Sequence, residues 1–172
     1  MRYSAIALAL LAMAGTAVGQ TPEWQFYQDD KATHGLLLAF VQSADGSQLM
    51  LKCDRAGKGK VYAIIVSPQT LAPPFSRDIV RRLDLRFDDG AAREDRWRYR
   101  DKTAKALDKP GERTLSRFLE GLVDAKRLKV IMYPSDTQAS PVITEFDVHD
   151  ADRAIDEVYK SCKDQNPVGS EG

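Results

Sequence analysis

The chain has few of the residue types from which metal sites and nucleophilic catalytic sites are built. It contains only two histidines and two cysteines in 172 residues. It also has no net charge, because 25 lysines and arginines balance 25 acidic residues, which argues against a broadly basic nucleic-acid-binding domain. With 43% hydrophobic residues, the chain is too apolar to be a disordered segment. We therefore expect one globular domain and no nucleic-acid partner.

Recognisable catalytic motifs are also missing. The patterns G-x-S-x-G, H-E-x-x-H and C-x-x-C do not occur. Residues 57–60 (GKGK) lack the spacing of a phosphate-binding loop and favour a hairpin turn. His149 is either a general base or metal ligand, or an exposed residue at a strand-to-helix corner, and His34 beside a glycine is typical of a turn. The sequence therefore predicts no catalytic residue, no metal and no cofactor.

No apolar run is long enough to cross a membrane as a helix. The uncharged run over residues 5–15 falls short of the roughly 18–20 residues that a span requires. It follows Arg2 and precedes Ala17 and Gly19, which are small residues at the −3 and −1 positions of a signal peptidase site. We expect residues 1–19 to be a signal peptide, residues 20–164 a single exported domain, and residues 165–172 a flexible tail. The mature protein would then be periplasmic or secreted, with no membrane span.

Cys53 and Cys162 are the only cysteines. In an oxidising compartment two thiols most often form one disulfide. A metal site or a reactive thiol would need helper residues, and no histidine lies within ten residues of either cysteine. We predict a Cys53–Cys162 disulfide, which would close a loop of roughly 110 residues and stabilise the fold by about 4–5 kcal/mol in the loop-entropy model.

Apolar periodicity predicts the secondary structure. Strands are predicted in seven segments, over residues 36–42, 48–53, 61–66, 79–87, 96–100, 128–133 and 142–148. Helical spacing predicts helices over 112–125 and 150–162, the second with Asp150 as its N-cap. We expect an α+β fold, with a mainly antiparallel sheet of six to seven strands, two helices and one disulfide.

A proline-rich segment separates two of the predicted strands. Residues 67–78 contain Pro68, Pro73 and Pro74, a density that neither a strand nor a helix interior accepts. We therefore predict a loop. A rigid loop of this kind could enter the active-site cleft of a secreted hydrolase such as lysozyme, which makes the protein a candidate hydrolase inhibitor.

Arginines are concentrated between residues 77 and 100, where eight of them accompany six acidic residues. Two interpretations remain open. The first is a solvated sheet face with ion pairs, and the second is a binding face of arginine side chains with Trp97 or Tyr99. Trp97 and Tyr99 share one strand face, where the sequence favours a buried aromatic pair over a platform for stacking sugars.

Several short motifs follow one another along residues 24–162. They are Trp24, LMLKC ending at Cys53, LRFD ending at Asp88, Trp97, FLEGL ending at Leu122, and FDV ending at Val148 before Cys162. In this order they resemble the VasI/TagO-like family of small periplasmic proteins associated with type VI secretion, and related exported domains of unknown function. The family usually has a glycine where this chain has His149-Asp150. The resemblance implies no established enzyme activity.

Arg86 and Asp88 lie in one of these motifs. Strand alternation places both on the face opposite Leu85 and Phe87. The resemblance implies that Arg86 is partly covered, and we expect the segment around Trp24 to cover it. Arg86→Ala would then destabilise the protein by about 2–3 kcal/mol. The candidate binding or structural face consists of Arg86, Asp88, Trp97, Tyr99 and Trp24.

The functional expectation is a non-catalytic exported binding or accessory domain of the periplasm, associated with the envelope or a secretion system. Its partner would be a protein or an envelope ligand. Two alternatives remain open, a hydrolase inhibitor and an envelope-polymer hydrolase. The hydrolase would require His34 or His149 to meet carboxylates in a cleft.

Overall fold

The computed structural model describes residues 23–29, 36–54, 57, 59–75 and 77–169. The predicted signal peptide and His34 lie outside these residues. The elements in chain order are β1 (Gln25–Asp29), β2 (Leu36–Gln42), β3 (Gln48–Cys53), β4 (Val61–Val66), β5 (Ile79–Phe87), β6 (Arg93–Arg100), β7 (Thr103–Ala106), α1 (Thr114–Leu122), β8 (Arg127–Met132), β9 (Val142–Asp147) and α2 (Ala151–Cys162). Within the described ranges, no helix is long and apolar enough to span a membrane.

The nine strands form one antiparallel sheet in the order β1-β2-β3-β4-β7-β6-β5-β8-β9. This corrects the predicted fold class, an α+β fold with six to seven strands. The two missed strands are β1 and β7. β1 lies at the edge of the sheet and its residues 25–28 are all exposed, so no apolar alternation marks it. β7 has four residues (TAKA), all but the first with low strand propensity.

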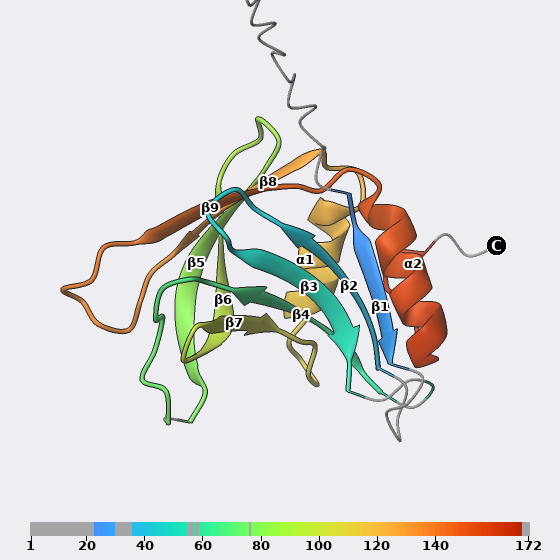
Figure 1. The fold of residues 1–172 in the computed structure, drawn as a ribbon, viewed down its shortest axis with the longest axis horizontal. Helices are drawn as coiled ribbons and strands as arrows, with labels where there is room; N and C mark the ends of the chain where they lie inside the picture. The colour runs from blue at the N-terminus through green and yellow to red at the C-terminus, as the bar shows by residue number, and fades with distance from the viewer. Residues whose placement is uncertain (1–22, 30–35, 55–56, 58, 76, 170–172) are drawn as a thin grey trace, which may run out of the picture.

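One face of the sheet, which we call the inner face, carries the core. Its side chains merge with the apolar faces of both helices into one buried cluster. The largest fully buried residues are Trp97, Tyr99, Phe118, Phe146, Leu49 and Leu51. α1 packs against β6 and β7, and α2 against β2, β3 and β4, so that both helices cover this face of the curved sheet (Figure 1). The opposite, outer face carries the alternate residues of each strand.

The predicted disulfide is confirmed. Cys53 ends β3 and Cys162 ends α2, their Cα atoms are 6.1 Å apart, and both residues are fully buried. The bond therefore fastens the end of α2 to the inner face of the sheet. Asp150 precedes α2 as predicted, but with φ 59° its side chain makes no capping hydrogen bond.

α1 is held by one carboxylate and one close aromatic contact. Asp108 accepts hydrogen bonds from the backbone N–H groups of Leu115 (2.7 Å) and Ser116 (3.2 Å), which satisfies the first turn of the helix. Gly121 faces Phe87, where a Cβ atom would lie only 2.5 Å from the ring. A glycine at this position therefore lets β5 approach the helix.

A polar cluster joins β9 to the turn between β2 and β3. The Thr144 hydroxyl lies within hydrogen-bond distance of Ser43 Oγ (2.9 Å) and of Asp45 Oδ1 (3.0 Å), and its one proton can be donated to either. Burial alone would raise the pKa of Asp45, but hydrogen bonds from Ser43, Ser47 and Thr144 outweigh it and hold the pKa below its ordinary value. β9, at one end of the strand order, thus lies beside β2, and the sheet curls toward closure.

Candidate functional site

The three aromatic residues of the predicted face belong to the core. Trp24 is 5% exposed, and Trp97 and Tyr99 are fully buried. The Trp97 ring meets Phe118 edge-on at 5.0 Å, and the Tyr99 hydroxyl donates to the Arg82 carbonyl (3.2 Å). These rings are closed to a ligand in this structure, so the arginines cannot share a binding surface with them.

Arg86 lies on the outer face of β5, opposite Lys129 of β8, and is exposed. The expected cover by the segment around Trp24 is not found, because Trp24 packs into the core on the other side of the sheet. Alternation placed Arg86 on the correct face, but it carries no information about what covers that face. The expected destabilisation of 2–3 kcal/mol for Arg86→Ala thus loses its basis.

Asp88 instead organises the end of β5. Its backbone adopts φ 48°, in the left-handed region, and its Oδ1 accepts hydrogen bonds from the N–H groups of Lys126 (3.0 Å) and Arg127 (2.8 Å). The Asp88 N–H donates to the Arg127 carbonyl (2.9 Å). The side chain therefore connects the turn after β5 to the start of β8.

His149 lies at the corner between β9 and α2. Its Nδ1 is 2.5 Å from Asp147 Oδ1, and its side chain is 36% exposed. The hydrogen bond and charge of Asp147 raise the pKa of His149 above its ordinary value, with smaller contributions from Asp150 and Glu23. His149 lines neither of the two clefts described below. In the part of the chain that the structure describes, no cluster of three or more potential metal ligands occurs.

Residues 67–78, here called the Pro-loop, connect β4 to β5, and Ser76 within them lies outside the described residues. The base of the loop is fixed to two neighbouring connections. The N–H groups of Leu71 (2.7 Å) and Ala72 (2.9 Å) donate to the Asp101 carbonyl in the β6–β7 turn, and Ser135 of the β8–β9 connection donates to the Leu71 carbonyl (2.7 Å). Leu71 and Ala72 are buried. The Pro-loop is thus anchored at its base.

The tip of the Pro-loop presents an aromatic ring. Phe75 is 99% exposed and follows Pro73 and Pro74 directly. The sequence predicted the loop from its prolines but did not single out Phe75. The exposure of one ring in a loop depends on how the base is anchored, which the sequence pattern does not show.

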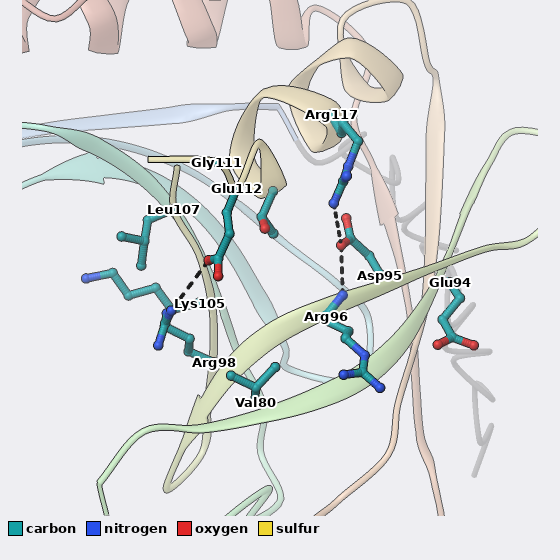
Figure 2. Close-up of a pocket in the computed structure, with 11 residues that line it drawn as sticks. Val80, Glu94, Asp95, Arg96, Arg98, Lys105, Leu107, Gly111, Glu112 and Arg117 are labelled. Carbon is teal, nitrogen blue, oxygen red and sulfur yellow. Dashed lines mark hydrogen bonds and ion pairs between the residues drawn. The ribbon is translucent and has the colours of Figure 1, made fainter. Parts of the chain in front are cut away.

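A cleft of about 510 Å³ opens where β7 ends (Figure 2). β7 pairs with β6 at residues 98–100, so among the described residues the first half of β6 pairs only with β5. Arg98 of β6 and Lys105 of β7 line the cleft, and Glu112, just before α1, points toward Arg98 with an N···O distance of 3.6 Å.

Asp95 is the most buried of the acidic residues that line this cleft, with 5% of its surface exposed. Its Oδ1 accepts hydrogen bonds from the Arg96 N–H (2.7 Å) and from Arg117 Nη2 (3.4 Å), as Figure 2 shows. The Asp95 carboxylate thus accepts a hydrogen bond from a backbone N–H group in the part of β6 that β7 does not pair with.

A larger cleft of about 1040 Å³ lies on the other side of residues 107–113 and shares Lys105 and Leu107 with the first. The Lys105 ammonium lies 3.6 Å from the centre of the Tyr62 ring, a cation–π contact. The Tyr62 hydroxyl donates to Asp54 (2.5 Å). Lys105 therefore stands at the junction of both clefts.

The sequence singles out Arg98 as part of the arginine-rich stretch, but it does not single out Lys105 or Glu112. These residues come from different elements and meet only because β7 is short. Comparison of the chain with protein-family models, with curated proteins and with solved structures found no match. The resemblance to the VasI/TagO-like family therefore stays a prediction, and function must be argued from the geometry of the site.

The roles of Asp88 and Arg86 can be separated by mutation. Asp88→Ala should lower the free energy of unfolding by about 1–2 kcal/mol, because it removes an acceptor for two backbone N–H groups at a left-handed position. Asp88→Asn, which keeps an oxygen acceptor and tolerates this backbone, should recover most of the loss. Arg86→Ala should stay within about 0.5 kcal/mol. Urea denaturation of the three variants checks this, and a larger loss for Arg86→Ala than for Asp88→Ala would contradict it.

His149 should make stability depend on pH. Because its folded-state pKa is raised, its stabilising contribution is fully present below the unfolded value near 6.5 and disappears as the pH rises through the folded-state pKa. Since the side chain is 36% exposed, solvent screening keeps this contribution below about 1 kcal/mol. Urea midpoints at pH 6 and pH 8 should therefore differ less in His149→Gln and in Asp147→Asn than in the unmodified protein. An unchanged difference in both variants would rule out this pair as its source.

Proposed function

We propose that the protein is an exported, non-catalytic binding or accessory domain that contacts a protein partner through the Pro-loop. The observation that carries this proposal is the pairing of an anchored loop base with a fully exposed ring. Leu71 and Ala72 are buried at the base, whereas Phe75 is 99% exposed at the tip.

The Pro-loop suits a binding role because it exposes an aromatic ring to solvent and because its base is already ordered. Aromatic residues are enriched at protein interfaces, where one buried ring contributes much of the binding energy. The prolines restrict the backbone dihedral φ on the approach to Phe75, and backbone hydrogen bonds of Leu71 and Ala72 hold the loop base. A partner would therefore lose little binding energy in ordering the base of the loop.

The disulfide and the N-terminal segment support an exported location. A buried disulfide between Cys53 and Cys162 fits a protein of an oxidising compartment. The predicted signal peptide over residues 1–19 supports export, and the resemblance to the VasI/TagO-like family supports a periplasmic role in the envelope or beside a secretion system.

The same loop favours one alternative, an inhibitor of a secreted hydrolase. An inhibitor must insert a pre-ordered segment into a cleft, and Phe75, which follows two prolines, is the most exposed large apolar residue in the part of the chain that the structure describes. The inhibitor and the accessory domain would use one surface and differ only in the identity of the partner.

The Phe75→Ser variant tests the proposal. The exported protein, its Phe75→Ser variant and an Ile143→Ser control would be immobilised and exposed to an envelope extract, and captured proteins measured by quantitative mass spectrometry. Ile143 is the matched control because it is also an exposed apolar residue, at 57%. We expect Phe75→Ser to reduce capture of the specific partner at least about tenfold with an unchanged melting temperature, since an interface aromatic of this kind contributes more than about 1.4 kcal/mol.

Parallel assays against a panel of secreted hydrolases distinguish the alternative. Inhibition by the unmodified protein that Phe75→Ser abolishes would identify an inhibitor. Capture and inhibition that are the same for Phe75→Ser and the unmodified protein would contradict a role of the Pro-loop in either function.

A further inference from the structure

The outer face carries one continuous row of side chains across six neighbouring strands. Each residue is the direct cross-strand partner of the next. In strand order the row is Phe40, Met50, Ile64, Lys105, Arg98 and Val80. Direct cross-strand partners have Cβ atoms about 5 Å apart. The apolar part of the row therefore adjoins its basic part at Ile64 and Lys105, and one ligand can contact both.

The apolar end of this row is not part of the core. Phe40, Met50 and Ile64 are half-buried, and none of them packs with the buried cluster. Both helices contact the inner-face side of the sheet. In the described part of the chain, these three side chains therefore form a half-buried apolar strip on the outer face, outside the core and beside a basic region.

The basic part of the outer face has more cations than its carboxylates can pair. On β5, β6 and β7 this face presents Arg82, Arg86, Arg96, Arg98, Arg100 and Lys105. Its carboxylates on these strands are Asp84 and Glu94, and both pair with Arg82. The chain as a whole has no net charge, so the positive charge is concentrated on this face.

Arg98 and Lys105 stand at the boundary between the two regions, at the mouth of the cleft in Figure 2. Lys105 is held over Tyr62, with its ammonium 3.6 Å from the ring centre. Arg98 faces Glu112 at 3.6 Å, beyond hydrogen-bond distance, and the Glu112 side chain is 59% exposed. A stronger anion can therefore displace Glu112 without unfolding any element.

We propose that this boundary binds an anionic amphiphile. A phosphate or carboxylate group lies between the Arg98 guanidinium and the Lys105 ammonium, and the apolar chain lies across Ile64, Met50 and Phe40. A guanidinium and an ammonium from directly paired residues of neighbouring strands suit the oxygens of such a group. The strip from β7 to β2 spans three strand spacings, about 14 Å, which suits an alkyl chain of medium length.

Microcalorimetric titration with three probes tests the ligand class. Dodecyl phosphate, below its micelle concentration, carries both features, inorganic phosphate carries only the anion, and dodecyl maltoside carries only the chain. We expect dodecyl phosphate to bind at least tenfold more tightly than either of the others. Equal affinity for dodecyl maltoside and dodecyl phosphate, or for inorganic phosphate and dodecyl phosphate, would overturn the proposal.

Variants locate the site. Arg98→Ala combined with Lys105→Ala should weaken dodecyl phosphate binding at least tenfold, whereas Arg86→Ala, on the same face but outside the row, should leave it within twofold. Glu112→Gln should strengthen binding severalfold because it removes the competing carboxylate, and a gain of affinity cannot arise from misfolding. Equal weakening by Arg86→Ala and by the double variant, or no gain from Glu112→Gln, would overturn the assignment.

A last comparison identifies the source of the amphiphile. Binding to vesicles that contain an anionic phospholipid, but not to zwitterionic vesicles, and its loss in the double variant would support a lipid headgroup at a membrane surface. Binding of the monomeric probe without vesicle binding would support a free amphiphile. The site is separate from the Pro-loop, so Phe75→Ser should bind dodecyl phosphate as the unmodified protein does, and failure of one proposal leaves the other standing.

Discussion

The disulfide between Cys53 and Cys162 joins the inner face of β3 to the last residue of α2 across 109 residues of chain. Without that bond, this end of the C-terminal helix would be held by apolar packing and by hydrogen bonds from the Gly57 N–H to the Ser161 carbonyl and from the Val61 N–H to Asp164. The unfolded chain would also gain the freedom that the closed loop removes. Because α2 is fixed on the inner face and α1 packs beside it, the packing of the domain takes place on one side of the sheet. The outer face therefore takes little part in the packing of the core.

Much of the fold follows from alternation in the sequence. The strongly alternating segments, such as 48–53 and 142–147, are strands in the structure, and the two amphipathic segments are helices. β1 and β7 were not predicted because apolar alternation and strand propensity do not mark them. β1 exposes residues 25–28 at a sheet edge, and β7 has four residues, of which the two alanines and the lysine have low strand propensity. The disulfide could be predicted because only two cysteines occur in a chain with a predicted export signal.

Less of the candidate site than of the fold can be predicted from the sequence. Prolines revealed the Pro-loop, but the exposure of Phe75 depends on hydrogen bonds from two other connections. The cleft beside α1 depends on where β7 ends, and no local pattern predicts that Lys105 and Arg98 become cross-strand partners. Arg86 shows the converse, because the motif resemblance predicts partial burial, whereas alternation places the residue on the face opposite Leu85, where it is exposed.

We conclude that packing on the inner face holds the domain together and that the outer face contributes little to its stability. Two adjacent isoleucines of β4 test it within one strand, since Ile65 is fully buried on the inner face and Ile64 is half-buried on the outer face. Urea denaturation should show that Ile65→Ala lowers the free energy of unfolding by about 2–5 kcal/mol, and Ile64→Ala by about 1 kcal/mol or less. Equal losses in the two variants would mean that the outer face is also packed, and would contradict the account.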